Sequence, residues 1–236
     1  MLTEASALAE LLPPGCALSG EPPLTVSVLY MRHIGWVAGH GYALVSVGFP
    51  IRHFTQSGEV LDGQFLPVIW ENLADPILTG REELGWAKLY ADIPDPIHLG
   101  DDYRCGALWQ GFRFFDVAIE QCREAGIEPA PALGSFHYKH VPRTGALDSA
   151  EVAYLEHAPA GQFATGYGGM SVERRLTGQG TFRFHRARWK DMLFQYPIIN
   201  ALADLPILDW RGATVTYSKS DAAIGDPSAG ALRPVE

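Results

Sequence analysis

The sequence has 236 residues, of which 47% are apolar, 11% aromatic and 19% charged. This apolar fraction is sufficient for a hydrophobic core and excludes a globally disordered chain. The 18 Lys and Arg residues against 27 Asp and Glu residues give a net charge of -9, which disfavours binding to the phosphate backbone of nucleic acids. We therefore expect a folded protein that does not bind nucleic acid.

The cysteines and the hydropathy pattern indicate the compartment. Cys16, Cys105 and Cys122 are an odd number of thiols without a CxxC pair, which favours a reducing environment. The N-terminus lacks a basic stretch followed by an apolar one, and no apolar run reaches the roughly 20 residues that span a bilayer. We expect free thiols, a cytoplasmic location and no membrane association.

The predicted elements are mostly short strands. Leucines at helical spacing before Pro13 predict a short helix over residues 1–12. Runs of β-branched, apolar and aromatic residues between turn residues predict strands over 24–31, 42–49, 64–70, 86–93, 104–109, 135–141, 150–156, 180–186 and 207–217. Asp116 is a suitable N-cap for a helix that ends before Gly126, and a second short helix is predicted over 198–203.

The order of these elements predicts the fold class. The sequence shows no repeat and no alternation of strands with helices, and residues 220–236 form an Ala-, Gly- and Pro-containing tail that we expect to be loose. Many short strands with few helices are typical of an antiparallel barrel or sandwich. We expect residues 1–236 to form a single, mainly β domain with a few short helices.

Lys88 is the most informative residue, because only four lysines occur and the other three lie beside polar or cationic residues. On a strand, the period of two places Trp86, Lys88 and Tyr90 on one face. Burial disfavours the ammonium form and can lower a lysine pKa by as much as ~3–5 units. A neutral amine can attack a carbonyl to form a Schiff base. The alternative is that Lys88 extends over Trp86 and places its head in water.

The run Gly80-Arg-Glu-Glu-Leu-Gly-Trp-Ala-Lys88 resembles the signature of the acetoacetate decarboxylase family, in which the Schiff-base lysine follows the glycine by eight residues. Weaker flanking motifs occur in the family's order, namely Leu11-Leu-Pro-Pro14, Asp75-Pro-Ile-Leu78, Lys139-His-Val-Pro142 and Leu202-Ala-Asp-Leu-Pro206. The resemblance implies a reactive amine at Lys88, a closed antiparallel β-barrel and a homo-oligomer.

Three positions differ from the pattern of family decarboxylases. Leu89 stands where these enzymes have a second lysine, and Leu29 and Leu44 align with two glutamates that face the site. A lowered lysine pKa must then come mainly from burial, or from a cation such as Arg81 or Arg104 brought near by the fold. The resemblance therefore implies a divergent member with a more apolar pocket, and not necessarily one acting on acetoacetate.

Other candidate residues have two interpretations each. Arg81 and Glu82 could bind a substrate carboxylate or relay a proton, or could form an internal ion pair that fixes the turn before Lys88. His137 and His140 are three apart, so on a strand they point to opposite faces and cannot chelate a metal together. With no HExxH motif or Cys/His cluster, we expect neither a metal nor a cofactor.

These observations favour a lyase whose partner is a small ketone or ketoacid. The leading hypothesis is a β-ketoacid decarboxylase-like enzyme in which Lys88 forms an imine while Trp86, Tyr90, Leu29 and Leu44 exclude water. An aldolase or aldol-dehydratase acting on a pyruvate-like ketoacid would use the same imine with an additional proton-handling group. The remaining alternative is a non-catalytic barrel that binds a small apolar ligand.

Overall fold

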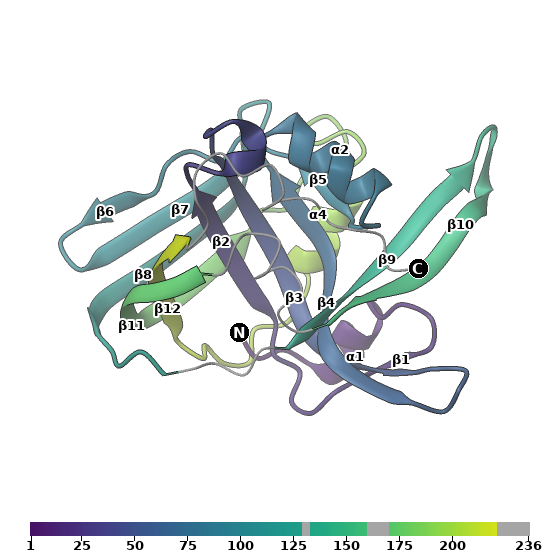
Figure 1. The fold of residues 1–236 in the computed structure, drawn as a ribbon, viewed down its shortest axis with the longest axis horizontal. Helices are drawn as coiled ribbons and strands as arrows, with labels where there is room; N and C mark the ends of the chain where they lie inside the picture. Colours follow the sequence, from purple (N-terminus) through teal and green to yellow (C-terminus); the bar gives the residue numbers. More distant parts are fainter. Residues whose placement is uncertain (129–132, 160–169, 221–236) are drawn as a thin grey trace.

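The computed structural model describes residues 1–128, 133–159 and 170–220, and in this part of the chain the protein is mainly β. Two sheets face each other, and the helices lie at their edges and over one face (Figure 1). The described helical elements are α1 (Ala5–Ala9), the 3-10 helix η1 (Gly35–Val37), α2 (Ala74–Glu82) and α4 (Tyr196–Ala203). None of the described helices is both long and apolar enough to cross a bilayer.

The larger sheet has seven strands arranged around β4. Its members are β1 (Cys16–Leu18), β2 (Thr25–Met31), β3 (Tyr42–Phe54), β4 (Val60–Glu71), β5 (Lys88–Tyr90), β9 (Gly134–Arg143) and β10 (Ala146–Ala158). β3 pairs with β4 in antiparallel orientation along one edge. Along the other edge, β4 pairs in parallel first with β9, over 63–65, and then with β5, over 69–71.

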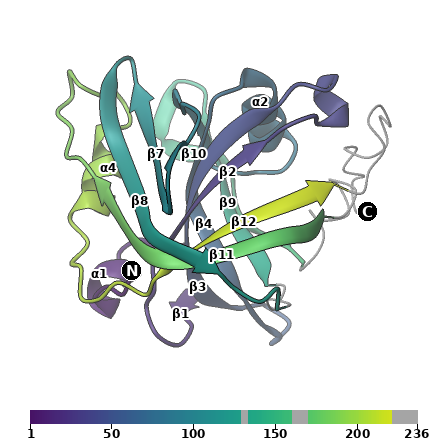
Figure 2. The same cartoon turned by 90° about the vertical axis from the view of Figure 1, so that its left-hand side faces the viewer.

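The smaller sheet is antiparallel throughout, in the order β12-β11-β8-β7-β6. Its strands are β6 (Ile97–Leu99), β7 (Asp102–Trp109), β8 (Phe112–Glu124), β11 (Met170–Phe184) and β12 (Ala213–Ser220). Figure 2 shows β8 and β11 in front of β3 and β4. The two sheets therefore form two layers.

The main hydrophobic core fills the space between these layers. Trp70 of β4 contacts Phe114 of β8, with ring centroids 5.2 Å apart, and both side chains are fully buried. Along β3, Val45 and Val47 are buried in the same core, whereas Leu44 between Ala43 and Val45 is only half-buried. This alternation shows that Leu44 lies on the opposite face of the larger sheet, away from the core.

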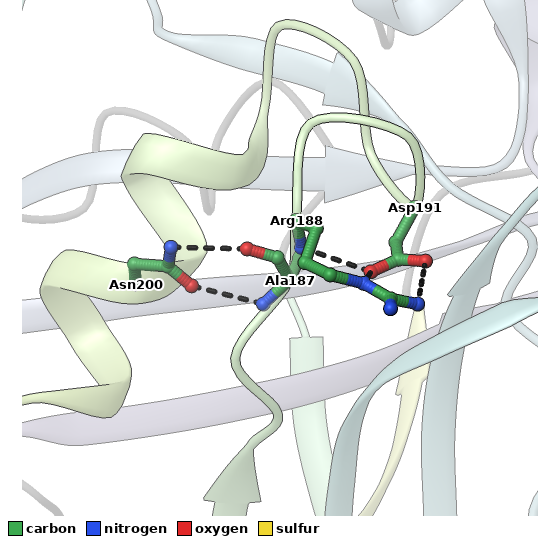
Figure 3. A network of polar contacts seen from close by, with 4 residues as sticks. All are labelled: Ala187, Arg188, Asp191 and Asn200. Atoms are coloured by element: carbon green, nitrogen blue, oxygen red, sulfur yellow. Dashed lines mark hydrogen bonds and ion pairs between the residues drawn. The ribbon is translucent and has the colours of Figure 1, made fainter.

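The connection from β11 to α4 is held by side-chain amide and carboxylate groups (Figure 3). The Asn200 side chain accepts a hydrogen bond from the main-chain amide of Ala187 and donates one to its carbonyl, at 2.9 and 3.0 Å. Asp191 accepts hydrogen bonds from the guanidinium and main-chain amide of Arg188. These bonds fix α4 against the core, where Ile199 is buried.

Most of the predicted elements are confirmed, with shifted ends. The N-terminal helix is shortened to α1, and the helix predicted over 198–203 is α4. The predicted strands correspond to β2, β3, β4, β5, β7, β9, β10, β11 and β12, although β5 covers only three residues. The tail expected to be loose lies outside the described residues from 221 onward.

The closed antiparallel barrel is wrong on two counts. The described strands form two open sheets rather than one closed ladder, and β4 has parallel partners in β5 and β9. Parallel neighbours need a crossover connection, and α2 supplies it between β4 and β5. Helix α2 has a weak signal in the sequence, because its N-cap residue, Leu73, forms no side-chain cap and Gly80 within it is a poor helix former.

The helix predicted from Asp116 is also wrong, because this segment lies within strand β8. β8 pairs with both β7 and β11, and Phe114 and Phe115 are buried in the core. The Asp116 carboxylate forms an ion pair with Arg113 and a hydrogen-bonding contact of 2.7 Å with His185 Nε2 instead of capping a helix. Tertiary pairing and burial therefore outweigh the local capping signal.

Candidate active site

The candidate site centres on an ion pair between Lys88 and Glu71. Lys88 begins β5 opposite Ile69 of β4, and Glu71 follows Ile69 by two residues. Paired residues and residues two apart share a face of a sheet, so the two side chains project to the same side. The Lys88 Nζ lies 2.9 Å from Glu71 Oε1, and the side chains are 3% and 1% exposed.

Helix α2 covers this face because it is the crossover between the parallel strands β4 and β5. The Lys88 Nζ donates a hydrogen bond to the main-chain carbonyl of Pro76, at 3.0 Å. The lysine stem crosses the helix at Gly80, where a Cβ would lie within 2.4 Å of Lys88 Cδ. A glycine is therefore needed at this position for the lysine to take this path.

Trp86 and His137 form an aromatic stack beside the amine. The Lys88 Nζ is 4.8 Å from the centroid of the Trp86 ring. The imidazole of His137 on β9 stacks on the same indole, with centroids 4.5 Å apart and an interplanar angle of 16°. His137 is fully buried, and its Nε2 lies 3.1 Å from the Ser135 hydroxyl. The stack therefore lies directly beside the amine.

Burial controls the protonation of the Lys88–Glu71 pair. Desolvation lowers the pKa of Lys88, against the opposing attraction of Glu71. Desolvation likewise raises the pKa of Glu71, against the opposing effect of Lys88. Both shifts favour the neutral forms, so transfer of a proton from the ammonium to the carboxylate costs much less than in water. Burial, together with the Lys88 charge, lowers the pKa of His137 to about 3, so this imidazole is neutral at pH 7.

Leu29 and Leu44 lie in register with Glu71. Leu29 of β2 pairs with Leu44 of β3, and Leu44 pairs with Glu71 of β4. The three side chains therefore lie in one row across the face that carries Lys88. Leu29 is 38% exposed, and Leu44 is half-buried.

Three other predicted site residues, Arg81, Glu82 and Tyr90, lie near the pair but do not contact the Lys88 amine. The Arg81 guanidinium donates a hydrogen bond to the main-chain carbonyl of Lys88, at 3.0 Å, so it fixes the start of β5. Glu82 accepts a hydrogen bond at its main-chain carbonyl from Lys139 Nζ, at 2.8 Å. The Tyr90 side chain is 43% exposed, and its hydroxyl donates to Asp92.

Arg104, which could have supplied a neighbouring cation, is exposed and faces Glu120 across the smaller sheet, at 3.7 Å. Desolvation is the first cause of the lowered pKa of Lys88. Of the two sources that the sequence left open, burial or a nearby cation, the structure therefore points to burial as the cause of the lowered Lys88 pKa.

Two members of the site, Glu71 and His137, were not predicted from the sequence. Glu71 ends the otherwise apolar run Val68-Ile-Trp, and this lone carboxylate at the end of a buried strand is the signal that could have identified it. His137 has no local signal for this role, because its stacking partner, Trp86, lies in a distant segment of the chain. Among the described residues, no group of three or more His, Cys, Asp or Glu side chains could hold a metal ion.

A pocket of about 340 Å³ lies at the ends of β2, β3 and β4. Its lining includes Tyr30, Tyr42 and Asn72, and Asn72 directly follows Glu71 in the chain. The Asn72 side chain accepts a hydrogen bond from the main-chain amide of Ala43, at 2.7 Å, which holds the end of β4 against β3. The pocket thus opens at the end of the strand that carries the buried carboxylate.

Comparisons with known proteins identify the family. The family model described as acetoacetate decarboxylase matches residues 1–218. The chain therefore belongs to the acetoacetate decarboxylase family. None of the curated proteins matches the sequence.

Similar solved structures agree in fold at low sequence identity. An acetoacetate decarboxylase from Legionella pneumophila is 18% identical, with a TM-score of 0.67 over 92% of this chain and 77% of that chain. An acetoacetate decarboxylase-like enzyme from Sphingomonas wittichii is 17% identical, with a TM-score of 0.64 over 92% and 84%. The enduracididine biosynthesis enzyme MppR, complexed with the condensation product of pyruvate and imidazole 4-carboxaldehyde, is 14% identical, with a TM-score of 0.62 over 92% and 80%.

Proposed function

We propose that the protein is a lyase in which Lys88 forms a Schiff base with a ketoacid, and that decarboxylation of a β-ketoacid is its leading reaction. The observation that carries this proposal is the buried Lys88–Glu71 pair. A buried lysine with a lowered pKa can supply a neutral amine, and perturbed ionisable groups concentrate at functional sites. Membership of the acetoacetate decarboxylase family supports the same chemistry.

In the proposed reaction, Glu71 first takes a proton from the Lys88 ammonium. The neutral amine attacks the ketone carbon, and the resulting carbinolamine loses its hydroxyl as water with a proton returned from Glu71. The bond to the carboxylate then breaks, CO2 leaves, and the electron pair moves to the iminium nitrogen to give an enamine. Protonation at carbon and hydrolysis release the ketone and the amine. The net reaction consumes one proton per CO2.

The surroundings of the pair support a largely apolar binding surface. Trp86 covers the amine on one side. On the other side of Glu71, Leu44 and Leu29 are its successive cross-strand neighbours. Such surroundings favour loss of the charged carboxylate as neutral CO2, because a low-polarity site stabilises an anion less well than water does. Since Lys88 is 3% exposed, substrate reaches its Nζ only when the neighbouring side chains or α2 move.

An aldolase or aldol-dehydratase is the second candidate. The likeness to MppR, whose structure contains a condensation product of pyruvate, favours this possibility. Glu71 could serve as the additional proton-handling group that an aldol step needs, because it lies 2.9 Å from the amine.

Reductive trapping tests the proposal. The purified protein would be incubated with acetoacetate, longer 3-oxo acids or pyruvate, reduced with borohydride, and measured by intact and peptide mass spectrometry. We expect a stable adduct on Lys88 with at least one ketoacid, and no adduct in the K88M variant. Release of CO2 would then indicate a decarboxylase, and its absence an aldolase. No adduct with any ketoacid would contradict the lyase and favour a non-catalytic ligand-binding protein.

A further inference from the structure

The contact between Trp86 and the Lys88 amine depends on what holds the indole in place. Trp86 precedes β5 in the turn that follows α2, and its main-chain amide donates to the Gly80 carbonyl. Its ring is packed against the imidazole of His137, which comes from β9. The indole is thus fixed from two separate segments, one of which also carries the reactive lysine.

The registers of β4 show why this contact is needed. β9 pairs with β4 over 63–65 and β5 pairs with it over 69–71, so residues 66–68 lie between the two parallel partners. Pro67 lies in this interval, and proline has no amide hydrogen to donate to a neighbouring strand. Between β9 and β5, side chains must therefore fill the gap that main-chain hydrogen bonds leave beside β4. The Trp86–His137 stack joins the two segments across this gap.

For packing alone, a histidine is less favourable at this position than an apolar residue, because its ring nitrogens must also be buried. In the part of the chain that the structure describes, the fully buried Nδ1 of His137 has no hydrogen-bond partner. Leaving a buried polar atom without a hydrogen bond destabilises the folded protein, because the atom loses its hydration without compensation. The other ring nitrogen, Nε2, lies 3.1 Å from the Ser135 hydroxyl on the same strand. This contact fixes the plane of the imidazole and hence the plane of the stacked indole.

Several charged groups surround the stack. Lys88 and Glu71 lie on the β4–β5 side, whereas Lys139 and Glu156 come from the hairpin of β9 and β10, with Glu156 in register opposite His137. The carboxylate of Glu156 interacts with both Trp86 and Lys139. A ring that carried a positive charge in this position would repel the ammonium of Lys88, whereas a neutral ring does not.

We propose that His137 is a positioning residue that holds the Trp86 indole against Lys88 and thereby keeps water away from the amine. The inference rests on the proposed role of Lys88 as the reacting amine. His137 acts through Trp86, so the flat shape of its ring matters more than its capacity to exchange protons. Loss of the flat ring should expose the amine to water and raise the labelling midpoint of Lys88 toward that of an ordinary lysine.

Two apolar variants of His137 distinguish the effect of a flat ring from the effect of side-chain volume. H137F retains a flat ring, whereas H137L fills the site without one. The reactivity of Lys88 would be followed from pH 5 to 10 by competitive labelling with acetic anhydride and peptide mass spectrometry, which needs no carbonyl substrate. Thermal unfolding would establish that each variant is folded. H140L is the matched control, because His140 lies on the same strand and is exposed.

We expect H137L to raise the labelling midpoint of Lys88 by at least about one pH unit, because desolvation shifts of this size and larger are common. In H137F and H140L the labelling midpoint of Lys88 should remain within about 0.3 pH units of its value in the unmodified protein. Borohydride trapping with a ketoacid at pH 7 should fall at least about tenfold in H137L alone.

An unchanged midpoint in folded H137L would overturn the inference. Equal loss of trapping in H137F and H137L without any change in midpoint would also overturn it, because the imidazole nitrogen itself would then be required. Failure to trap any ketoacid in the unmodified protein would refute the proposed lyase, but the labelling midpoints would still test the role of His137.

Discussion

Lys88 and Glu71 form an ion pair of 2.9 Å in which both side chains are almost completely removed from water. Two charges in such a position lose hydration that their mutual attraction repays only partly, so a buried pair of this kind is not required for stability. Removal of one partner, however, leaves the other uncompensated. In the proposed reaction, this pair places a proton donor and a proton acceptor side by side.

Replacement of Glu71 should make Lys88 more acidic. In E71Q the amine keeps its burial but loses the nearby negative charge that raises its pKa. An opposite charge at this distance commonly contributes about 1–3 pKa units, so the labelling midpoint of Lys88 should fall by a similar amount. Turnover of a ketoacid should nevertheless decrease, because the proton acceptor is lost. A rise in the midpoint would contradict the assigned electrostatics.

Replacement of Lys88 should leave Glu71 as an unpaired buried acid. The pKa of Glu71 is raised by burial and held down by Lys88, so in K88M it should rise further. The folded state then binds more protons than the unfolded state, and stability falls as the pH rises above the ordinary carboxyl pKa. We expect K88M to lose about 3–5 kcal/mol of unfolding free energy at pH 8, and less at pH 5.

The double variant K88M/E71Q is the control for this loss. Because it removes both charges, its unfolding free energy from urea titration should exceed that of K88M at pH 8. Its stability should also change less between pH 5 and pH 8. Equal values for the single and double variants at both pH values would show that Glu71 is not buried as a charged partner of Lys88.

A methyl group at Gly80 should displace the lysine. The Cβ of G80A would lie 2.4 Å from Lys88 Cδ and 2.5 Å from Cε, closer than packed atoms approach. We expect G80A to cost about 1–3 kcal/mol of stability and to reduce borohydride trapping strongly. Gly126 is a suitable control, since a Cβ there would meet no atom within 4 Å. Full trapping in G80A would contradict the observed path of the lysine stem.

Protonation of His137 should destabilise the protein in acid. Its pKa is about 3 in the folded state, below the ordinary value of 6.5, so the unfolded state binds more protons between these values. This contribution to stability is complete above about pH 6.5 and falls as the pH decreases toward 3. Relative to H137F, the unmodified protein should lose about 2–3 kcal/mol between pH 7 and pH 4.5 in urea titrations. A constant difference between the two proteins across this range would contradict the burial of a neutral imidazole.

The sequence was sufficient to predict the strands rich in β-branched and aromatic residues and to single out Lys88, which the structure buries beside Glu71. Runs of β-branched and aromatic residues predict β2, β3 and β4. Lys88 stands out because its sequence neighbours are apolar. Helix α2 could not be predicted from propensity, because Leu73 provides no N-cap and Gly80 disfavours a helix, whereas the parallel pairing of β4 with β5 requires a crossover connection.

The neighbours of Lys88 were predicted less well, for reasons of long-range pairing. The stack of Trp86 on His137 joins segments that are distant in the chain and depends on how β9 aligns with β4. The helix predicted at Asp116 failed for a similar reason, because two neighbouring strands pair with that segment. Patterns within a short window do not determine such pairings.

The Lys88 amine and three of the residues that contact it lie close together in the sequence as well as in space. Glu71, Pro76, Gly80 and Lys88 all belong to one strand–helix–strand unit, formed by β4, α2 and β5. By contrast, Leu29, Leu44 and His137 come from outside this unit. If the proposed lyase is correct, substitutions in β2, β3 or β9 can therefore reshape the substrate-binding walls without altering the unit that carries the amine and its acid.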